Sequence, residues 1–215
     1  MKLPRSKNPS VALTLVELLV VVALLGVIGL FLYPQLRRHR LPRSPRINCV
    51  NNLKQVALGF QLWAGTARYP TVVSTNLGGA LEYVTNGDVF WGFKVMSNEL
   101  ATPKILVCPT DTRLAATSFT TGFSNTNISY FVGLDADASN PQMWLAGDRN
   151  IVSGQQPTNR ILTLTSNDVV SWTRAMHKLQ GNVAIADGHV DQLSTRGLQQ
   201  ALRSSGAVTN RLALP

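Results

Sequence analysis

Charged residues, cysteines and histidines are all scarce in this sequence. Only 14% of its 215 residues are charged and 45% are hydrophobic, which is the composition of a folded protein and not of a disordered one. The two cysteines and three histidines form no C-x-x-C pair and no H-E-x-x-H motif, and no serine stands in a nucleophile elbow. The usual signatures of zinc sites, metalloproteases and serine hydrolases are therefore missing. Internal repeats and low-complexity tracts are missing too.

Acidic residues are also few, and the excess of basic residues is unevenly distributed. The chain has 20 Lys and Arg and 11 Asp and Glu, a net charge of +9. From Ile47 onward, however, 12 basic residues face 10 acidic ones, which leaves +2. A nucleic-acid-binding protein normally carries its basic patch on the folded domain. We therefore expect no nucleic-acid partner.

One long stretch has almost no polar residues. From Leu13 to Tyr33 only Thr14 and Glu17 are polar. A helix of about 21 residues is about 31 Å long, close to the roughly 30 Å hydrocarbon core of a bilayer. No A-x-A-like cleavage site ends the stretch, as it would in a removable secretory signal. We predict a transmembrane helix over residues 13–33.

Glu17 is the only charged residue in that stretch. A carboxylate costs about 2.5 to 3.5 kcal/mol at the centre of a membrane helix and less near its end. Glu17 is therefore either an interfacial charge of a plain anchor or a residue with a function and a partner. Its context favours the second interpretation, because a basic leader and then Ala12 precede Leu-Thr-Leu-Val-Glu and the apolar helix.

This arrangement resembles the type III signal of type IV pilins and type II secretion pseudopilins. The resemblance implies that a prepilin peptidase cuts between Ala12 and Leu13 and methylates the new amine. Glu17 would then be the fifth mature residue and would act in assembly. The family usually has Gly before the cut and Phe after it, where this chain has Ala12 and Leu13. Pro34 stands where the family commonly bends its helix.

The resemblance also implies a location and a set of partners. The protein would cross the inner (cytoplasmic) membrane once, with the N-terminus in the cytoplasm and the domain exported. Its partners would be the peptidase, other pilin or pseudopilin subunits and the inner-membrane assembly platform. The positive-inside rule indicates the opposite orientation, because five arginines between Arg37 and Arg46 follow the apolar stretch and three basic residues precede it.

A second resemblance concerns the rest of the chain. His177 followed after nine residues by Asp187-Gly188 is similar to the H-X9-DG domain of prepilin-type proteins. Members also carry a Cys-Val-Asn-Asn-Leu-Lys-Gln segment and a Cys-Pro-Thr-Asp segment, which here are Cys49 to Gln55 and Cys108 to Asp111. The resemblance therefore extends over most of the organised parts of the chain. It implies an exported pilin-like domain over residues 46–215, with the H-X9-DG segment at 177–188.

The residues of this segment allow two interpretations. His177, Asp187 and His189 could supply metal ligands or an acid–base pair. Alternatively, Asp187-Gly188 forms a hairpin turn and His177 makes a hydrogen bond across a sheet. A two-residue type I′ turn would pair Ala186 with His189.

Three further features have alternatives. Cys49 and Cys108 would form a disulfide in an exported domain and would stay reduced in cytoplasm, and two buried free thiols are equally compatible with the sequence. Asp135 and Asp137 alternate as in a calcium loop but lack the Gly and Glu of an EF-hand, so a surface turn is the alternative. The pair Asp148-Arg149 is an ion pair or a turn, and no function is assigned to it.

Periodicity predicts an α+β fold, and the resemblance implies that this fold is pilin-like. Residues 34–45 form a basic hinge with three prolines, and Ser44-Pro45 begins an amphipathic helix over 46–64 that packs on a small antiparallel sheet. A short helix is expected at 77–83 and a last helix from Thr195 to Arg203. Strands are expected at 91–96, 128–133, 143–147, 161–165 and in a hairpin over 182–193.

These features together predict a structural protein and not an enzyme. We expect a pseudopilin-like subunit of a type II secretion or type IV pilus-like assembly, without a cofactor apart from a weakly indicated calcium ion. The alternative is a membrane-anchored metal-binding or hydrolytic domain that uses His177, Asp187 and His189.

Overall fold

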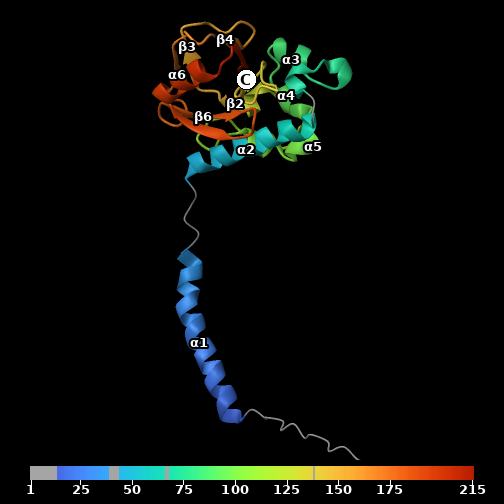
Figure 1. The fold of residues 1–215 in the computed structure, drawn as a ribbon. Helices are drawn as coiled ribbons and strands as arrows, with labels where there is room; N and C mark the ends of the chain where they lie inside the picture. The colour runs from blue at the N-terminus through green and yellow to red at the C-terminus, as the bar shows by residue number, and fades with distance from the viewer. Residues whose placement is uncertain (1–13, 39–43, 66–67, 138) are drawn as a thin grey trace, which may run out of the picture. The chain divides into compact units, whose positions relative to one another are not determined.

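A computed structural model describes residues 14–38, 44–65, 68–137 and 139–215. The chain divides into two compact units, Met1–Arg43 and Ser44–Pro215. Helix α1 (Leu15–Arg38) belongs to the first unit, and all other helices and strands belong to the second (Figure 1).

Helix α1 continues beyond the end that the sequence suggested. The predicted helix ended at Tyr33, whereas α1 includes Pro34 and ends at Arg38. Proline lacks one N–H donor, so a single proline removes one hydrogen bond and leaves the others of the helix in place. The start of the predicted hinge at residue 34 is thus too early.

The prediction of a membrane-spanning helix is wrong. Within the described residues, no helix is both long enough and apolar enough to cross a membrane. The predicted location as a single-pass protein of the inner membrane is wrong for the same reason.

Helix α2 (Pro45–Ala64) is the long helix of the second unit. It begins after Ser44 with Pro45 in its first turn, as predicted. The side chains that it buries share one face and recur at steps of three and four residues: Cys49, Leu53, Val56, Ala57, Phe60 and Ala64. Because these positions form an apolar stripe, α2 lies against the sheet by that face.

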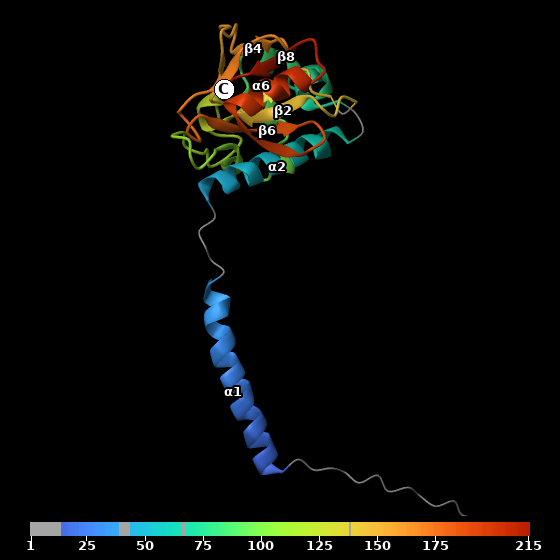
Figure 2. The ribbon, with the colours of Figure 1, turned by 60° about the vertical axis from the view of Figure 1, so that its left-hand side comes forward.

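The sheet has six strands in the order β4-β8-β1-β2-β6-β7, and every pairing in it is antiparallel (Figure 2). The predicted α+β fold with an antiparallel sheet is confirmed. The strands are β1 (Tyr130–Gly133), β2 (Trp144–Asp148), β4 (Ile161–Leu164), β6 (Gln180–Ile185), β7 (Val190–Ser194) and β8 (Asn210–Ala213). A separate ribbon pairs β3 (Ile151–Ser153) with β5 (Val170–Trp172).

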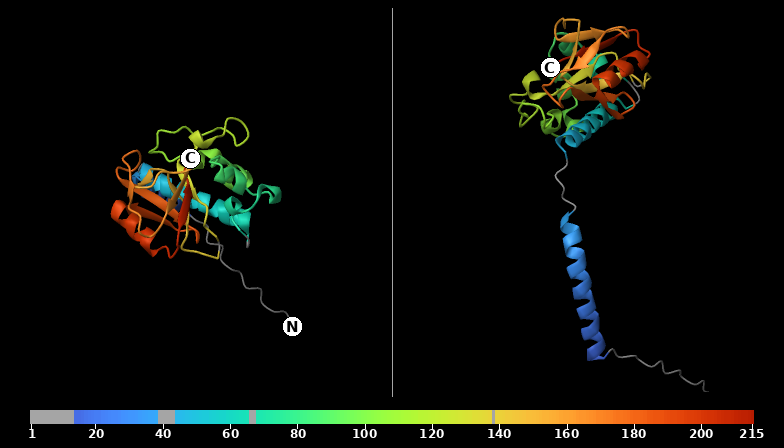
Figure 3. Two further views of the ribbon diagram at one scale, coloured as in Figure 1. Left: turned by 90° about the horizontal axis from the view of Figure 1, so that it is seen from above. Right: turned by 90° about the vertical axis from the view of Figure 1, so that its left-hand side faces the viewer.

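Alternating side chains divide the core into two parts. Along β1, Tyr130 and Val132 join the core under α2, and Phe131 between them joins a second core with α6 (Thr195–Ser204) and the β3-β5 ribbon. This alternation follows from the two-residue repeat of a strand. Figure 3 shows α6 and the short helices on opposite sides of the sheet. Side chains at even positions of β1 and β6 thus face α2, whereas an irregularity in β2 places Trp144 in the second core and Leu145 in the core under α2.

Short helices fill the middle of the chain. They are η1 (Pro70–Val72), η2 (Thr75–Leu77), α3 (Leu81–Thr85), α4 (Phe90–Lys94), α5 (Ser97–Leu100), η3 (Pro103–Leu106) and η4 (Asn125–Asn127). The strand predicted over 91–96 is wrong, because α4 occupies that place. Val89, Phe93, Met96 and Leu100 are buried at steps of four, three and four, the repeat of a helix. The helix predicted at 77–83 begins later, at Leu81.

The β6-β7 hairpin has a different register from the predicted one. Ala184 pairs with Val190, and the Gly188 amide donates to the Ile185 carbonyl, 2.9 Å away. Gly188 has φ +95°, whereas Asp187 does not have a positive φ. A type I′ turn needs two positive φ values, so a three-residue loop with Gly188 in the left-handed position forms in its place. The predicted pairing of Ala186 with His189 is therefore wrong by one residue.

Candidate functional site

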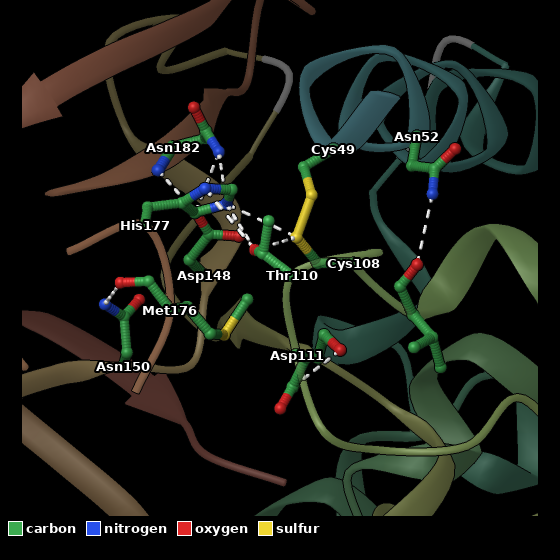
Figure 4. The surroundings of a disulfide bond; sticks show 12 residues. Cys49, Asn52, Cys108, Thr110, Asp111, Asp148, Asn150, Met176, His177 and Asn182 are labelled. Carbon is green, nitrogen blue, oxygen red and sulfur yellow. Dashed lines mark hydrogen bonds and ion pairs between the residues drawn. A yellow bond between two sulfur atoms is a disulfide. The ribbon is translucent and has the colours of Figure 1, made fainter. Parts of the chain in front are cut away.

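The two cysteines join the start of α2 to the segment after η3. Cys49 and Cys108 form a disulfide, and both side chains are fully buried. The bond links positions 59 residues apart, which in the chain-entropy model stabilises the domain by about 4 kcal/mol. One turn further along α2, Asn52 donates a hydrogen bond to the Val107 carbonyl. Figure 4 shows that both contacts hold the same segment against α2.

His177 lies directly beside this disulfide (Figure 4). Its side chain is only 1% exposed. Its Nε2 atom is 3.3 Å from Cys108 Sγ, 3.3 Å from Asn182 Nδ2 and 3.4 Å from Asp148 Oδ2. Thr110 Oγ1 is 3.4 Å from each ring nitrogen. A sulfur, an amide, a carboxylate and a hydroxyl thus surround one buried imidazole nitrogen.

A strained turn carries His177 into this position. His177, Lys178 and Leu179 have φ values of +49°, +51° and +65°, the left-handed region that costs a non-glycine residue about 1 kcal/mol or more. The buried Asn150 side chain holds this turn, because its amide donates to the carbonyls of Thr173, Met176 and Gln180. The local conformation that places His177 therefore depends on a residue of the β2-β3 loop.

Asp148 is the buried carboxylate of the site. It accepts hydrogen bonds from the backbone N–H and the side-chain amide of Asn182, at 2.7 and 2.8 Å. Burial raises the pKa of Asp148 to about 7, although the hydrogen bonds from Asn182 oppose the shift. Burial, and then the charge of Arg46, lower the pKa of His177. Near neutral pH His177 is therefore mainly uncharged, and Asp148 is only partly ionised.

Asp111, which follows Thr110, and Arg149, which follows Asp148, form a separate ion pair with each other. Asp111 accepts from Arg149 Nε and Nη2 at 2.8 and 2.7 Å, and from the Ser129 hydroxyl at 2.7 Å. Burial alone would raise the pKa of Asp111, but the hydrogen bonds from Arg149 and Ser129 outweigh it and lower that pKa. Asp148 and Arg149 thus belong to separate contacts, one with His177 and one with Asp111.

Asp187 and Gly188 lie at the opposite end of β6 from His177. The Ala186 carbonyl just before the turn accepts hydrogen bonds from the Tyr69 hydroxyl and the Gln61 side chain, at 2.8 and 3.3 Å. Gln61 belongs to the last turns of α2. The Asp-Gly turn is therefore attached to the C-terminal part of α2, and the disulfide and His177 are attached to its N-terminal part.

Strand β6 thus runs along α2 in the same direction, with a contact at each end. Arg46 donates to Gln180 at the start of the strand, and Gln61 donates to Ala186 at its end. Fifteen residues of helix rise about 22 Å and six residues of strand about 20 Å, so the two lengths match. The H-X9-DG segment holds one strand against one helix at both ends, and His177 and Asp187 do not meet.

His189 pairs locally with the hairpin carboxylates. Its Nδ1 is 2.5 Å from Asp187 Oδ1 and its Nε2 is 3.4 Å from Asp191 Oδ2, and all three side chains are substantially exposed. The predicted alternative, a metal or hydrolytic site built from His177, Asp187 and His189, does not assemble in this fold. The strand length separates His177 from the other two residues.

The weak calcium candidates have other partners. Asp135 accepts from the backbone N–H of Arg211 and from its guanidinium, at 2.5 to 2.9 Å. Asp137 accepts from the Ser139 backbone and hydroxyl, and Arg68 lies 3.9 Å from it. The two carboxylates thus point to different protein groups and form no shared cation site.

Among the described residues, one group gathers metal-ligand atoms: Cys49, Cys108 and His177, whose ligand atoms all lie within 4.8 Å of one another. Metal ligation by cysteine requires the thiolate. While the two sulfurs are bonded to each other, His177 is the only ligand of the three that is free to bind.

The N-terminal candidates are only partly within the described structure. Ala12 and Leu13 lie outside the described residues, and Pro34 lies inside α1. Glu17 and Thr14 form a capping box at the start of α1. Glu17 accepts from the Thr14 N–H and hydroxyl, both at 2.9 Å, and the Glu17 N–H donates to Thr14 Oγ1. These hydrogen bonds lower the pKa of Glu17.

Sequence reasoning gave no role to three residues that build the buried site, namely Asp148, Asn150 and Asn182. Each is at most 3% exposed. Asp148 and Asn182 interrupt otherwise apolar strand patterns, and a polar residue in such a position needs a partner when it is buried. These interruptions are the sequence signal from which a buried polar site at Asp148 and Asn182 could have been predicted.

The chain matches no model of a protein family, no curated protein and no solved structure.

Proposed function

We propose that this protein is a structural subunit that assembles through α1, in the manner of a pilin or pseudopilin of a type II secretion or type IV pilus-like machine. The proposal includes processing by a prepilin peptidase between Ala12 and Leu13, with methylation of the new amine. In such an assembly, the α1 helices of neighbouring subunits pack against one another.

The exposed apolar surface of α1 carries this proposal. Every described side chain from Leu15 to Phe31 is exposed, with Leu15 80%, Leu30 77% and Phe31 75% exposed. A helix that is apolar on all sides is stable only when something covers it. Burying a leucine or phenylalanine side chain contributes about 1.5 to 3 kcal/mol. Packing of α1 helices against one another would supply that burial many times over.

The domain also supports a structural function. Its core is complete in one chain, and the disulfide and both contacts of β6 hold it together. His177 does not meet Asp187 or His189, so a hydrolytic function that needs all three residues has less support. A stable domain on an apolar assembly helix is the design of a structural subunit.

Cross-linking through α1 tests the proposal. No cysteine in the described residues is free, so one added cysteine gives one reactive thiol. Leu19→Cys and Leu30→Cys should give ladders of cross-linked subunits with a short bismaleimide in the native cell. The matched control is Val208→Cys, at a side chain that is 89% exposed on the domain. Absence of α1 ladders, or equal ladders from the control, would contradict assembly through α1.

Mass spectrometry of the amino terminus tests the processing step separately. The expected mature protein begins at Leu13 and carries a methylated amine. An intact Met1 terminus in assembled protein would rule out the processing without affecting the cross-linking result.

A further inference from the structure

We propose that the reduced form of this domain binds one Zn²⁺ ion through Cys49, Cys108, His177 and Asp148, in the place where the oxidised form has its disulfide. The proposal is independent of assembly through α1. Its starting point is the only group of metal-ligand atoms among the described residues, which the disulfide blocks as long as it is intact.

The distances already suit a tetrahedral ion. Zinc binds thiolate sulfur at about 2.3 Å and imidazole nitrogen at about 2.0 to 2.1 Å, which places a sulfur and a nitrogen about 3.5 Å apart in a tetrahedral site. His177 Nε2 is 3.3 Å from Cys108 Sγ. Reduction therefore has to separate the two sulfurs and let Asp148 approach them, and His177 can remain in place.

Asp148 is the candidate fourth ligand; it lies beside His177 but outside the group whose atoms are all within 4.8 Å of one another, so it has to approach the sulfurs as they separate. Its side chain is fully buried, its Oδ2 is 3.4 Å from His177 Nε2, and its Oδ1 has no hydrogen-bond partner. A buried carboxylate oxygen without a hydrogen-bond partner is free to accept a ligand, water or ion. Carboxylate oxygen also belongs to the usual zinc ligands, at about 2.0 to 2.2 Å.

The surrounding charge agrees with a site of this composition. Two thiolates and one carboxylate around Zn²⁺ leave one negative charge. Arg46 is close enough for its charge to act on both Asp148 and His177, and its buried Nε has no hydrogen-bond partner. A cation beside a negative metal cluster offsets the cost of burying it.

The redox step is balanced by a dithiol reductant. The dithiol transfers two electrons and two protons, the disulfide becomes two thiols, and the reductant itself becomes a disulfide. Zinc then displaces both thiol protons to water. His177 binds through Nε2 and keeps its proton on Nδ1, which faces Thr110 Oγ1 at 3.4 Å. Before oxidation, the metal would thus join the same two segments that the disulfide joins afterwards.

Titration of the full chain with Co²⁺, a spectroscopic substitute for Zn²⁺, tests the proposal. The chain is reduced with a phosphine, freed of metal and compared with the oxidised chain. We expect one equivalent of Co²⁺ in the reduced chain, with a thiolate charge-transfer band and the intense visible bands of a tetrahedral site, both lost when Zn²⁺ is added. The oxidised chain should show neither band.

Variants identify the ligands. His177→Gln and Asp148→Asn should each weaken binding at least about 10-fold, and Cys49→Ser should abolish the charge-transfer band. His189→Gln, which changes an exposed histidine of the hairpin, is the matched control and should bind like the unaltered chain. The near-UV circular dichroism of the buried Trp144 and Trp172 reports whether each protein is folded.

Several results would overturn the proposal. They are absence of the bands in a reduced and folded chain, equal binding by the oxidised chain, and unchanged binding by His177→Gln. If the reduced, metal-free chain loses its near-UV signal, Zn²⁺ should restore it, and failure to do so would also overturn the proposal.

Discussion

At the scale of single residues, the buried polar side chains of the domain depend on one another. Asn182 supplies two hydrogen bonds to Asp148, and Asp148 and Cys108 enclose His177. Each of these groups would be costly to bury alone. Together they make the junction between α2, β2 and β6 specific, because an apolar residue at any one position would leave the others without a partner.

His177→Ala should destabilise the oxidised domain by about 1 to 3 kcal/mol, the range for removing one partner of buried hydrogen-bonding groups. Urea unfolding with and without the change measures the loss. His189→Ala, at a half-exposed position, is the control and should change the free energy of unfolding by less than about 0.5 kcal/mol. An unchanged stability in His177→Ala would show that the contacts around its ring contribute nothing.

Asp111 should give the domain an acid-sensitive stability. Its pKa is lower in the folded than in the unfolded state, so its contribution is fully present above the unfolded value and is lost as the pH falls through the folded value. Asp111→Asn should cost about 3 kcal/mol at neutral pH, the low end for a broken buried ion pair, since Arg149 is 24% exposed.

Unfolding curves between about pH 2 and pH 7 test this expectation. The difference between the unaltered domain and Asp111→Asn should shrink as the solution becomes more acidic. Asp88→Asn, on the surface, is the control. A difference that stays constant over this range would show that the Asp111 charge is not what stabilises the domain.

The sequence indicated some of the residues of the site but not how they are arranged. The sequence indicated that Cys49, Cys108 and His177 matter, and the structure places them together. It indicated Asp148 only through the interruption of an apolar strand pattern, and the role of a buried carboxylate is recognised only when its partners, which come from distant segments, are known. The sequence could not separate His177 from Asp187, since ten residues can either fold back or extend as a strand.

At the scale of elements, the matched lengths of α2 and β6 explain why the two ends of the H-X9-DG segment are fixed. A strand one residue longer or shorter would move either His177 away from the disulfide or Ala186 away from Gln61. A change of one residue also turns alternate side chains to the other face of the sheet. The spacing of the segment is therefore a structural requirement of this fold.

Gly188→Ala should destabilise the domain by about 1 to 2 kcal/mol, because an alanine is strained at φ +95°. An added Cβ would also lie 2.8 Å from the Gln61 side-chain nitrogen. Gly188→Ala should therefore destabilise the domain less when it is made in a Gln61→Ala background. Gly154→Ala, where nothing lies within 4 Å, is the control and should be nearly neutral. Equal thermal stability of Gly188→Ala and Gly154→Ala would contradict the proposed role of the turn.

Elements with a clear repeat were predictable and short ones were not. The apolar stripe predicted α2, and alternation predicted β1, β2, β4 and the hairpin. In the segment of α4, aromatic residues favoured a strand, while the wider spacing from Val89 to Leu100 indicated a helix. The hairpin register failed because Asp-Gly fits more than one turn type. Strands β3 and β5, of three residues each, are too short to show a pattern, and β8 was missed although it is as long as β1 and β4.

At the scale of the whole molecule, the chain combines a self-sufficient domain with an exposed apolar helix. The membrane interpretation of that helix was wrong, since apolar composition alone does not determine what covers it. Under the proposed function, other copies of α1 cover it. Glu17 would then lie in an apolar bundle, where an unpaired carboxylate costs several kcal/mol and the Leu13 amine of a neighbouring subunit is a suitable counter-ion.

Two substitutions at Glu17 separate this role from helix capping. Glutamine can replace glutamate in a capping box, so Glu17→Gln keeps the contact with Thr14 and removes only the charge. Glu17→Leu removes both. We expect both variants to keep the near-UV spectrum and unfolding curve of the domain, because α1 belongs to a separate compact unit.

The most direct test is therefore the recovery of sheared, sedimentable polymer from cells that produce the unaltered chain, Glu17→Gln or Glu17→Leu at equal levels. The account predicts polymer from the unaltered chain and only unassembled subunits from both variants. Polymer from Glu17→Gln alone would reduce Glu17 to a helix cap, and normal polymer from Glu17→Leu would contradict assembly through a charged α1 terminus.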